Sequence, residues 1–567
     1  FSVADTVSKA DGGTFDGNIT FAGELITSSS GTSNVRIGDN AGDAIQSGGN
    51  FNILIGDEAG TAITTGDSNI AIGHGAGDAL TTGTNNVAVG HLALSTEDAN
   101  GFNTAVGHEA LKTLNAGADA HNTAVGYLAG KLVTTGVNNV LMGASAGTAL
   151  TDADNNTAVG YLALTTDTQG SRSTAIGNQA LQLQNFTSAT EVYNTAVGFF
   201  AGRIITTGIQ NTLIGGLAGD ALTDADHNVA VGSEALSTDT QGSKSVAVGR
   251  EALRQQNFSS ATDSHNTAVG YRAGLLVTTG DSNTLIGSEA GDALTTGKNN
   301  TVVGKGALGT DTKGKECVAI GNGALFTQNF TSLTNAFNTA VGSSAGGAVT
   351  NGTKNTLIGA LAGDNINTGN ENTIVGYSSG NVVGGSNNVI VGSECSNSNT
   401  SVSNEYLIGR AASGSGANTF TIGSGDTDVQ INIDGSDTSW SATSDERLKD
   451  NINTLGIGLD FINELRPVSY KWKEKKDVDE SLGRYYEKDS TDPCRGSGDV
   501  HYGLIAQEVK TVIDKYSLTG NHHIWKEGVD GFQVVGIGNV MPILLKAVQE
   551  LSAKNDALEA RIKTLEG

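Results

Sequence analysis

The feature that most constrains the fold of this chain is a repeat of fixed length. The segment NTAVGYLAG, which begins at Asn122, returns with small changes twice, each time 72 residues further on. From Gly126 to Gly342, the glycines that end these units are separated by 17, 17, 17 and 21 residues, and this set of steps occurs three times. Weaker copies extend the pattern over residues 38–392. A chain that repeats one short unit this often folds as a stack of that unit.

A step of 17 residues with one short apolar segment predicts a β-solenoid, because it is too short for a pair of helices. Glycine fits the corners of each coil, and asparagine at a fixed position can stack into a ladder along the axis. In segments such as TAVG and TLIG, two successive residues are apolar, so both faces of the strand require burial. One face fills the interior of the coil. The other predicts that coils pack side by side in an oligomer.

These units resemble the head repeats of trimeric autotransporter adhesins, although the coils here are longer than the usual adhesin unit. The resemblance covers roughly residues 30–395. It implies a left-handed parallel β-roll around a threefold axis. A stack of coils has no intrinsic chemistry, so the resemblance implies a fold and not an activity.

Every fourth coil carries four extra residues and one phenylalanine. Two interpretations of these phenylalanines stay open. The ring projects and contacts a ligand, or it braces a neighbouring subunit, since exposed aromatic side chains usually find cover. The residues concerned are Phe186, Phe258 and Phe330.

Composition narrows the function classes. The chain has 567 residues and a formal charge of −26, which argues against nucleic acid or an anionic membrane as a partner. No apolar run approaches the ~20 residues that span a bilayer, so we expect no membrane insertion. Cys317, Cys395 and Cys494 lie far apart and predict free thiols. We expect neither a metal nor a cofactor.

After residue 444 the chain changes character. All three prolines, Pro467, Pro493 and Pro542, fall there. The segment GLDFINEL predicts a short helix, VSYKW a strand, and YGLIAQEVKTVIDKY an amphipathic helix, with a charged loop over residues 473–499.

The C-terminal tail has an unbroken heptad pattern, which predicts a coiled coil. Leucine at every d position with β-branched residues at two a positions favours two strands, whereas the β-roll requires three. We expect three, because a short tail follows the symmetry of the body that carries it. The a positions are Met541, Val548, Asn555 and Ile562, and the d positions are Leu544, Leu551, Leu558 and Leu565.

The segment SDERLKDNI at Ser444–Ile452, followed in order by GLDFINELRPVSYKW, YGLIAQEV and the heptads, is similar to the C-terminal intramolecular chaperone auto-processing domain of phage tail fibres and endosialidase tailspikes. A related domain occurs in membrane-bound myelin regulatory factors. The resemblance implies that the domain drives homotrimerisation and then cuts itself off at the Ser444–Asp445 bond. It implies Ser444 as the nucleophile and Lys449 as the general base.

The spacing of this pair adds a constraint. Serine needs an adjacent base, and lysine is a base only when neutral, which requires burial or a nearby cation such as Arg447. Five residues apart, Ser444 and Lys449 share a face in neither a strand nor a helix. The dyad therefore needs a bend in the chain or a lysine from a neighbouring chain, and both routes stay open. Local sequence alone favours a different interpretation, a capping box of Thr443 and Glu446 that opens a helix.

The sequence thus predicts a mainly β chain: a trimeric left-handed β-roll or β-solenoid shaft, then a small α+β chaperone domain that ends in a coiled coil. The expected segments are an N-terminal β connector (1–30), β-roll repeats (31–396), a second β connector (397–444), the chaperone domain (445–540) and the coiled coil (541–567).

The expected function is that of a homotrimeric phage tail fibre, a virion protein assembled in the host cytoplasm. Its expected partners are other virion tail proteins and a host cell-surface receptor, and its expected chemistry is one self-cleavage. The alternative is a cellular trimeric surface adhesin with an uncleaved trimerisation domain. That class carries a secretory leader and a membrane anchor, and the sequence shows the pattern of neither. An ice-binding surface is disfavoured, because the threonines are confined to one corner of the coil.

Overall fold

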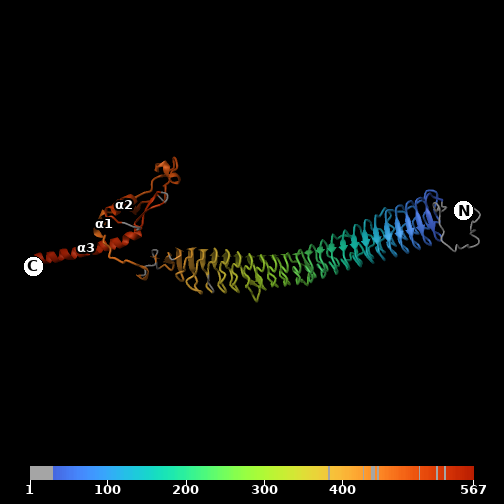
Figure 1. Ribbon diagram of the computed structural model, residues 1–567, viewed down its shortest axis with the longest axis horizontal. Coiled ribbons are helices and arrows are strands. Elements are labelled where there is room, and N and C mark those ends of the chain that lie inside the picture. The colour runs from blue at the N-terminus through green and yellow to red at the C-terminus, as the bar shows by residue number, and fades with distance from the viewer. Residues whose placement is uncertain are drawn as a thin grey trace, which may run out of the picture. The chain divides into compact units, whose positions relative to one another are not determined.

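The computed structural model describes residues 30–380, 384–425, 427–435, 441–442, 446–496, 498–518, 522–528 and 531–567. The chain divides into two compact units, Phe1–Thr443 and Ser444–Gly567. The first unit is a stack of coils, and the helices α1, α2 and α3 belong to the second (Figure 1). The prediction of a mainly β chain with a β-solenoid and a small C-terminal unit containing helices is confirmed.

The solenoid is built from short parallel strands, one in each coil, paired in register so that each residue faces its equivalent in the next coil. The strands of this stack are β1 (Val35–Ile37), β2 (Ile53–Ile55), β3 (Ile70–Ile72), β4 (Val87–Val89), β5 (Thr104–Val106), β6 (Thr123–Val125), β7 (Val140–Met142), β8 (Thr157–Val159), β10 (Thr174–Ile176), β12 (Thr195–Val197), β13 (Thr212–Ile214), β14 (Val229–Val231), β16 (Val246–Val248), β18 (Thr267–Val269), β19 (Thr284–Ile286), β20 (Thr301–Val303), β22 (Val318–Ile320), β24 (Thr339–Val341), β25 (Thr356–Ile358), β26 (Thr373–Val375), β27 (Val389–Ser393), β28 (Glu405–Arg410) and β29 (Thr419–Ser424). Two antiparallel strands follow, β30 (Val429–Asn432) and β31 (Ser441–Ala442).

The middle residue of each three-residue strand fills the interior of its coil. Ala268, Leu285 and Val302 on three successive strands are fully buried. This arrangement confirms that one face of the strand closes the core within a single chain. The flanking strand residues point outward.

Glycine after each strand is required by the distance between coils. Gly287 has φ +135°, and a Cβ there would lie 2.6 Å from the carbonyl oxygen of Gly304 in the next coil. Only a residue without a side chain fits this corner, as the repeat predicted.

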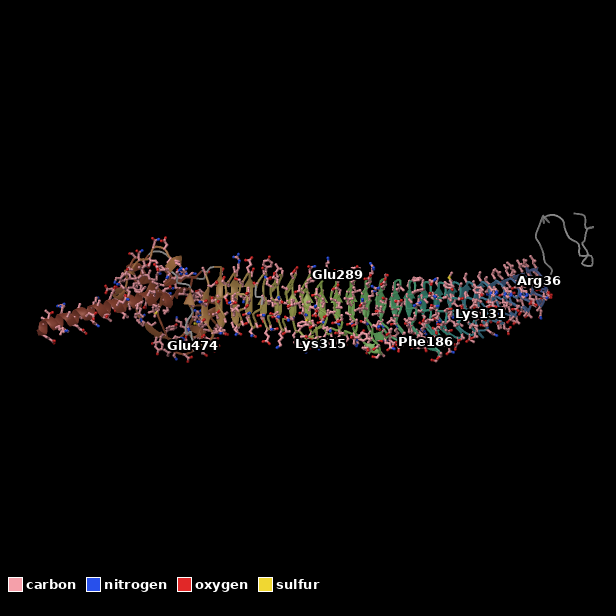
Figure 2. The ribbon with its side chains drawn as sticks, turned by 90° about the horizontal axis from the view of Figure 1, so that it is seen from below. Arg36, Lys131, Phe186, Glu289, Lys315 and Glu474 are labelled. Carbon is pink, nitrogen blue, oxygen red and sulfur yellow. The ribbon has the colours of Figure 1, made fainter. Side chains whose placement is uncertain are left out.

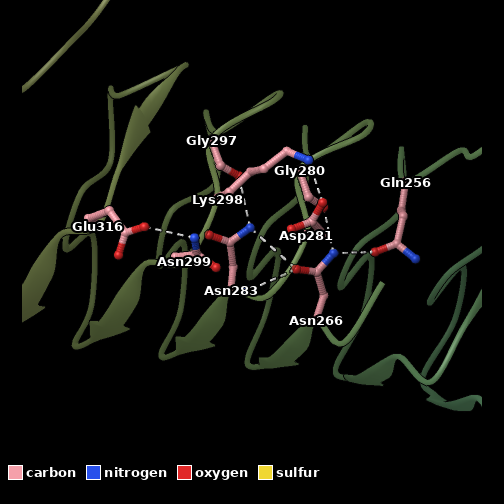
Figure 3. A network of polar contacts seen from close by, with 9 residues as sticks. All are labelled: Gln256, Asn266, Gly280, Asp281, Asn283, Gly297, Lys298, Asn299 and Glu316. Atoms are coloured by element: carbon pink, nitrogen blue, oxygen red, sulfur yellow. Dashed lines mark hydrogen bonds and ion pairs between the residues drawn. The ribbon is translucent and has the colours of Figure 1, made fainter. Parts of the chain in front are cut away.

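The asparagine before each strand forms the predicted ladder (Figure 3). The backbone N–H of Asn283 donates to the side-chain oxygen of Asn266 at 2.9 Å. The side-chain amide of Asn283 donates to the carbonyl of Gly297, also at 2.9 Å. Both asparagines are fully buried, so each rung satisfies polar groups that would otherwise be costly to bury.

The ladder is broken at every fourth coil and repaired by the extra residues. Ser245 stands where an asparagine is expected, and the Gln256 side chain reaches into its place. The Gln256 amide donates to the buried carboxylate of Asp239 at 2.5 Å and to the Ser245 hydroxyl at 2.9 Å, while its oxygen accepts from Asn266 at 2.8 Å. The same arrangement recurs in the other two long coils, with Gln184 and Asp167, and with Gln328 and Asp311.

The long coils also add short side sheets to the stack. Each one pairs two strands of two residues in parallel. The pairs are β9 (Gly170–Ser171) with β11 (Thr190–Glu191), β15 (Gly242–Ser243) with β17 (Thr262–Asp263), and β21 (Gly314–Lys315) with β23 (Thr334–Asn335).

Both expectations for the phenylalanines of these coils were wrong. Phe186, which is labelled in Figure 2, is 8% exposed, and Phe258 and Phe330 are 6% exposed. The reason is the backbone: the N–H of Phe258 donates to Asp239 at 3.1 Å, which fixes the segment against its own coil. The rings are covered by their own chain and neither project to a ligand nor await a neighbouring subunit.

Charged side chains replace the usual repeat residues near the first and the last described coils of the parallel stack. Arg36 takes the interior position of β1, in the first described coils (Figure 2), and its guanidinium donates to the Ala41 carbonyl and the Asp43 carboxylate. At the other end, Glu405 replaces the ladder asparagine, and its buried carboxylate accepts a hydrogen bond from the N–H of Gly416 at 2.9 Å. Polar end coils of this kind close the apolar interior of a solenoid.

The second unit is a small α/β body. Its elements are the 3₁₀ helix η1 (Glu446–Leu448), α1 (Leu459–Glu464), β32 (Val468–Tyr470), the 3₁₀ helices η2 (Lys475–Asp477) and η3 (Glu480–Tyr485), β33 (His501–Gly503), α2 (Ala506–Lys515), β34 (Trp525–Glu527), β35 (Gln533–Val535) and α3 (Ile537–Glu566). The two strand pairs, β32 with β33 and β34 with β35, are antiparallel. The apolar core contains Phe461, Val509, Val512, Ile513, Ile524 and Ile543.

The predicted helices and the predicted strand of this unit are found. Three details differ: the expected loop over residues 473–499 contains η2 and η3, α3 begins at Ile537, and the junction has no helix cap in the described residues. Thr443, the expected cap, lies outside the described residues. Glu446 opens only a single 3₁₀ turn, and no α-helix follows it in the described residues before Leu459. In the described part of the chain, no helix is both long enough and apolar enough to cross a membrane.

Candidate cleavage and assembly site

The structure describes only one of the two residues of the expected dyad. Ser444 and Asp445 lie outside the described residues. Lys449 follows the 3₁₀ turn η1, and its backbone N–H donates to the carbonyl of Glu446 at 3.0 Å. The chain therefore bends between the positions of the expected nucleophile and the expected base. A bend was one of the two routes that the spacing allowed, and the contribution of a second chain stays a prediction.

The exposure of Lys449 matters for its expected role as a base. Lys449 and its neighbour Asp450 are both exposed in the single chain. A lysine acts as a base only when it is neutral, and burial is one of the ways to neutralise it. In the single chain the Lys449 side chain does not have this burial.

Lys449 stands on an irregular stretch, residues 449–458, which we call the arm. Its side-chain contacts include a local one, in which the Asn453 amide donates to the carbonyl of Asn451 at 2.9 Å. Ile452 is 63% exposed. Ile457 packs against the core of the unit, so the arm joins the folded body at its C-terminal end.

The base of the arm is held by a residue far away in the sequence. The backbone N–H of Leu459, the first residue of α1, donates to the carboxylate of Glu550 on α3 at 2.8 Å. The preceding Gly458 caps α1 without a side-chain hydrogen bond of its own. Glu550 thus supplies the cap that the local sequence lacks.

All of the expected seam residues lie on one helix, α3, and their apolar members are exposed. The exposed fractions are Met541 58%, Leu544 40%, Val548 56%, Leu551 47%, Leu558 53%, Ile562 53% and Leu565 85%. Asn555 is exposed with them. A stripe of this length is not covered within the chain, and exposed apolar stripes mark interaction surfaces.

The structure extends this stripe beyond the residues that the sequence analysis found. Ile537, seven residues before Leu544, is 53% exposed at the first position of α3, and Leu545 is 62% exposed beside the seam. The signal for Ile537 was present in the sequence as one more heptad step before Leu544. Leu545 widens the apolar face beyond the a and d positions.

The opposite face of α3 packs on its own chain. Ile543 and Ala547 are 2% exposed, and α1 packs against this part of the helix. Beyond Glu550, residues 551–567 are all exposed. The N-terminal half of α3 is therefore part of the body, whereas the C-terminal half has no partner within the described chain.

Residues 444–518 match the family model described as chaperone of endosialidase. The match begins at Ser444, the expected nucleophile. No curated protein and no solved structure matches the chain. The C-terminal unit thus carries an endosialidase-type chaperone domain, and a β-solenoid shaft precedes it.

The shaft, which this match does not cover, also has an open apolar face. In the three-residue strands of the stack, from β1 to β26, the third residue is valine, isoleucine or methionine and points outward. Ile286 is 39% exposed and Ile358 is 40% exposed. This second face is the one that the sequence analysis expected to require a partner.

The histidine and cysteine side chains elsewhere in the described residues do not form a second site. The ring of His501 packs near Tyr470 and Trp472, with ring centroids 5.7 and 6.3 Å away. His522 accepts a hydrogen bond from the backbone of Ile524. Cys317 is buried, which raises the pKa of its thiol to about 12 and makes it a poor nucleophile. Within the described ranges, no cluster of histidine, cysteine and acidic residues could hold a metal ion.

Proposed function

We propose that this chain is the subunit of a homotrimeric phage tail fibre whose C-terminal unit directs assembly and is then released by self-cleavage at Ser444–Asp445. The observation that carries the proposal is the match of residues 444–518 to the chaperone of endosialidase, which begins at the expected cleavage site. The solenoid before the match suits a structural shaft.

The trimer is supported by two apolar surfaces that one chain leaves open. The first is the stripe on α3, where Leu545 adds a third apolar position to the a and d pattern. A face of this width suits more than two helices. The second is the outward face of the strand stack, which is continuous over many coils.

The self-cleavage step is written as an acyl transfer. The hydroxyl of a Ser444 gives its proton to a neutral Lys449 amine. The serine oxygen then attacks the carbonyl carbon of a Ser444–Asp445 bond, either its own or that of a neighbouring chain. The C–N bond breaks, the proton passes to the nitrogen of Asp445, and water then hydrolyses the ester to restore the hydroxyl and form a carboxyl group. Attack by a serine on its own carbonyl carbon would form a four-membered ring. A serine from a neighbouring chain avoids this strain, which favours cleavage between chains.

The test is expression of residues 1–567, followed by denaturing gel and intact-mass measurement. We expect a fragment that begins at Asp445. Ser444→Ala should abolish the cut and leave the trimer intact, and Lys449→Ala should do the same. A chain that trimerises but stays at full length would sink the self-cleavage part of the proposal.

Co-assembly of the two variants tests which chain supplies each group. Mixed trimers of Ser444→Ala and Lys449→Ala chains should show some cleavage if the dyad forms between chains. If such trimers never cleave, the dyad forms within one chain.

The shaft is proposed to attach the virion to a host cell-surface receptor and to contact other tail proteins, after assembly in the host cytoplasm. An acidic, elongated solenoid without a described enzyme site supports a structural and adhesive role. Purified fibre should compete with the intact phage for adsorption to host cells. Fibre that neither binds these cells nor slows adsorption would contradict the attachment role.

A further inference from the structure

Glu550 lies where two functional parts of the C-terminal unit meet. Its carboxylate accepts the backbone N–H of Leu459 at 2.8 Å, a contact that spans 91 positions in the sequence. Leu459 directly follows the arm that begins with Lys449. Glu550 itself stands on α3, the helix that carries the exposed stripe. One side chain therefore connects the base of the arm to the assembly helix.

The fit at this point is close and depends on a glycine. A Cβ added to Gly458 would lie 2.5 Å from one carboxylate oxygen of Glu550 and 2.8 Å from the other. Any side chain at position 458 would displace the carboxylate. The chain thus keeps the space that Glu550 needs in order to reach the start of α1.

The position of Glu550 along α3 is a boundary. Ile543 and Ala547, on the preceding turns, are buried against the body, and every residue from Leu551 onward is exposed. In heptad terms Glu550 is at c, away from the a and d stripe. The exposed half of α3 is a single helix in water, and helices of that length are only marginally stable without packing.

Packing of the apolar stripe against partner helices would therefore stabilise α3 at Glu550. When the C-terminal half of α3 packs against partner helices, the helix is held through residue 550 instead of fraying near it. The carboxylate is then fixed against Leu459, and the base of the arm is fixed with it.

We propose that Glu550 is a positioning residue for the self-cleavage, and that assembly of the helices holds its contact with the base of the arm in place. The inference rests on the proposed function, because it assigns a role in that reaction. It supplies a physical reason for a cut that follows trimerisation. Glu550 takes no proton and touches no reacting atom in this role, since it acts through the backbone of the arm.

The experiment uses the full chain with Glu550→Leu, Glu550→Gln and Gly458→Ala. The leucine variant removes the acceptor, and the glutamine variant keeps an acceptor oxygen of the same reach. Gly458→Ala disturbs the same contact from the other side and leaves α3 unchanged. For each chain, the trimer is followed by native mass spectrometry, and the cleavage rate by the appearance of the fragment that begins at Asp445.

We expect Glu550→Leu and Gly458→Ala to form trimers and to cleave about 10- to 100-fold more slowly, as misplaced catalytic groups do. Glu550→Gln should cleave within about threefold of the natural chain, because a neutral acceptor still caps Leu459. The rate should rise with pH through the same midpoint in all four chains, since the chemistry of the dyad is unchanged and only the fraction of well-placed arms differs.

Three outcomes overturn the proposal. Trimers of Glu550→Leu and Gly458→Ala that cleave at the natural rate show that the contact does not matter. Loss of the trimer in both variants assigns Glu550 to folding alone. A shifted pH midpoint assigns it to the proton transfer. Failure of the natural chain to cleave is a different result, since it removes the proposed function whatever Glu550 does.

Discussion

The shaft and the C-terminal unit differ in how they bury their apolar side chains. In the shaft, each coil closes its own interior, with a buried residue from each strand and an asparagine ladder that satisfies the buried polar groups. In the C-terminal unit, the core is small, and a long helix exposes its most apolar stripe to solvent. The shaft interior needs only the next coil, whereas the end of α3 stays exposed in the described chain.

This difference indicates where assembly is decided. A stack of nearly identical coils has local contacts that give little information on how many chains should associate. A heptad stripe specifies both the number and the register of its partners. We therefore infer that trimerisation begins in the C-terminal unit. Variants that damage only one of the two units test whether trimerisation begins in the C-terminal unit.

The largest effect is expected from a charge in the stripe. Leu558→Asp would place a carboxylate from every chain at the centre of the helix contact, at a cost of about 3 kcal/mol or more per chain for a buried, unpaired charge. Leu558 lies beyond Glu550 and beyond the part of α3 that packs on α1, so the body of the unit should still fold. Native mass spectrometry should show monomers, and the cut should be lost with the trimer.

The matched control is Ala553→Asp, which puts the same charge at an outward f position of the same exposed helix segment. It should leave both the trimer and the cut unchanged. Trimers of normal stability from Leu558→Asp chains would show that assembly is decided in the shaft, contrary to the comparison above.

A smaller and strictly local effect is expected inside the shaft. Gln256→Leu removes the amide that donates to the buried Asp239 carboxylate and the oxygen that accepts from Asn266. A buried charge that loses one of its donors costs about 2–3 kcal/mol. Because each coil contacts only its neighbours, hydrogen exchange should speed up in β14, β16 and β18 and stay slow in distant coils. The C-terminal unit should trimerise as before.

Gln255→Leu is the control for this change, because the neighbouring side chain is exposed. Its exchange pattern should match that of the natural chain. Uniform destabilisation of the whole shaft by Gln256→Leu would mean that the coils unfold as one cooperative unit, and the local account of the ladder would then be wrong.

The sequence predicts the shaft well because its contacts repeat. The interval between coils places the glycine corners, the asparagine ladder and the buried middle residue of each strand, since each residue meets its own equivalent in the next coil. The repair of the ladder could not be predicted in this way. Gln256 and Ser245 lie 11 positions apart in a coil of unusual length, and only the folded coil brings them together. The same folding-back turned the phenylalanine rings inward.

At the candidate site, the sequence supplied motifs and the structure supplied their surroundings. The heptads predicted which face of α3 is apolar, and that face is the exposed one. The contact between Leu459 and Glu550 has no sequence signal, because it joins distant segments through one backbone N–H. The roles of Ser444 and Lys449 remain predictions from the resemblance, with the turn before Lys449 as the structural feature that agrees with them.

The smallest predicted effect concerns how the stability of the shaft depends on pH through one buried carboxyl group. Burial raises the pKa of the Asp220 carboxyl above its usual value, nearby Glu234 adds to this, and Arg203 opposes it. One carboxylate oxygen of Asp220 is buried without a hydrogen-bond partner in the described structure. The folded shaft therefore binds this proton more tightly than the unfolded chain does. Its stability is greatest below the unfolded pKa and falls as the pH rises through the raised folded value.

Asp220→Asn removes the charge and should raise the melting temperature of the shaft at neutral pH by no more than about 2 °C. The gain should shrink as the pH falls towards and below the ordinary aspartate pKa of about 3.9, because the natural carboxyl then takes up its proton. Asp224→Asn, at an exposed position four residues further on, should show neither effect. A gain that persists in acid would assign the stabilisation to the new amide and not to the lost charge. A loss at neutral pH would mean that Asp220 is held in place by its attraction to Arg203. This second result would mean that the shaft depends on its charged side chains more than its self-closing coils suggest.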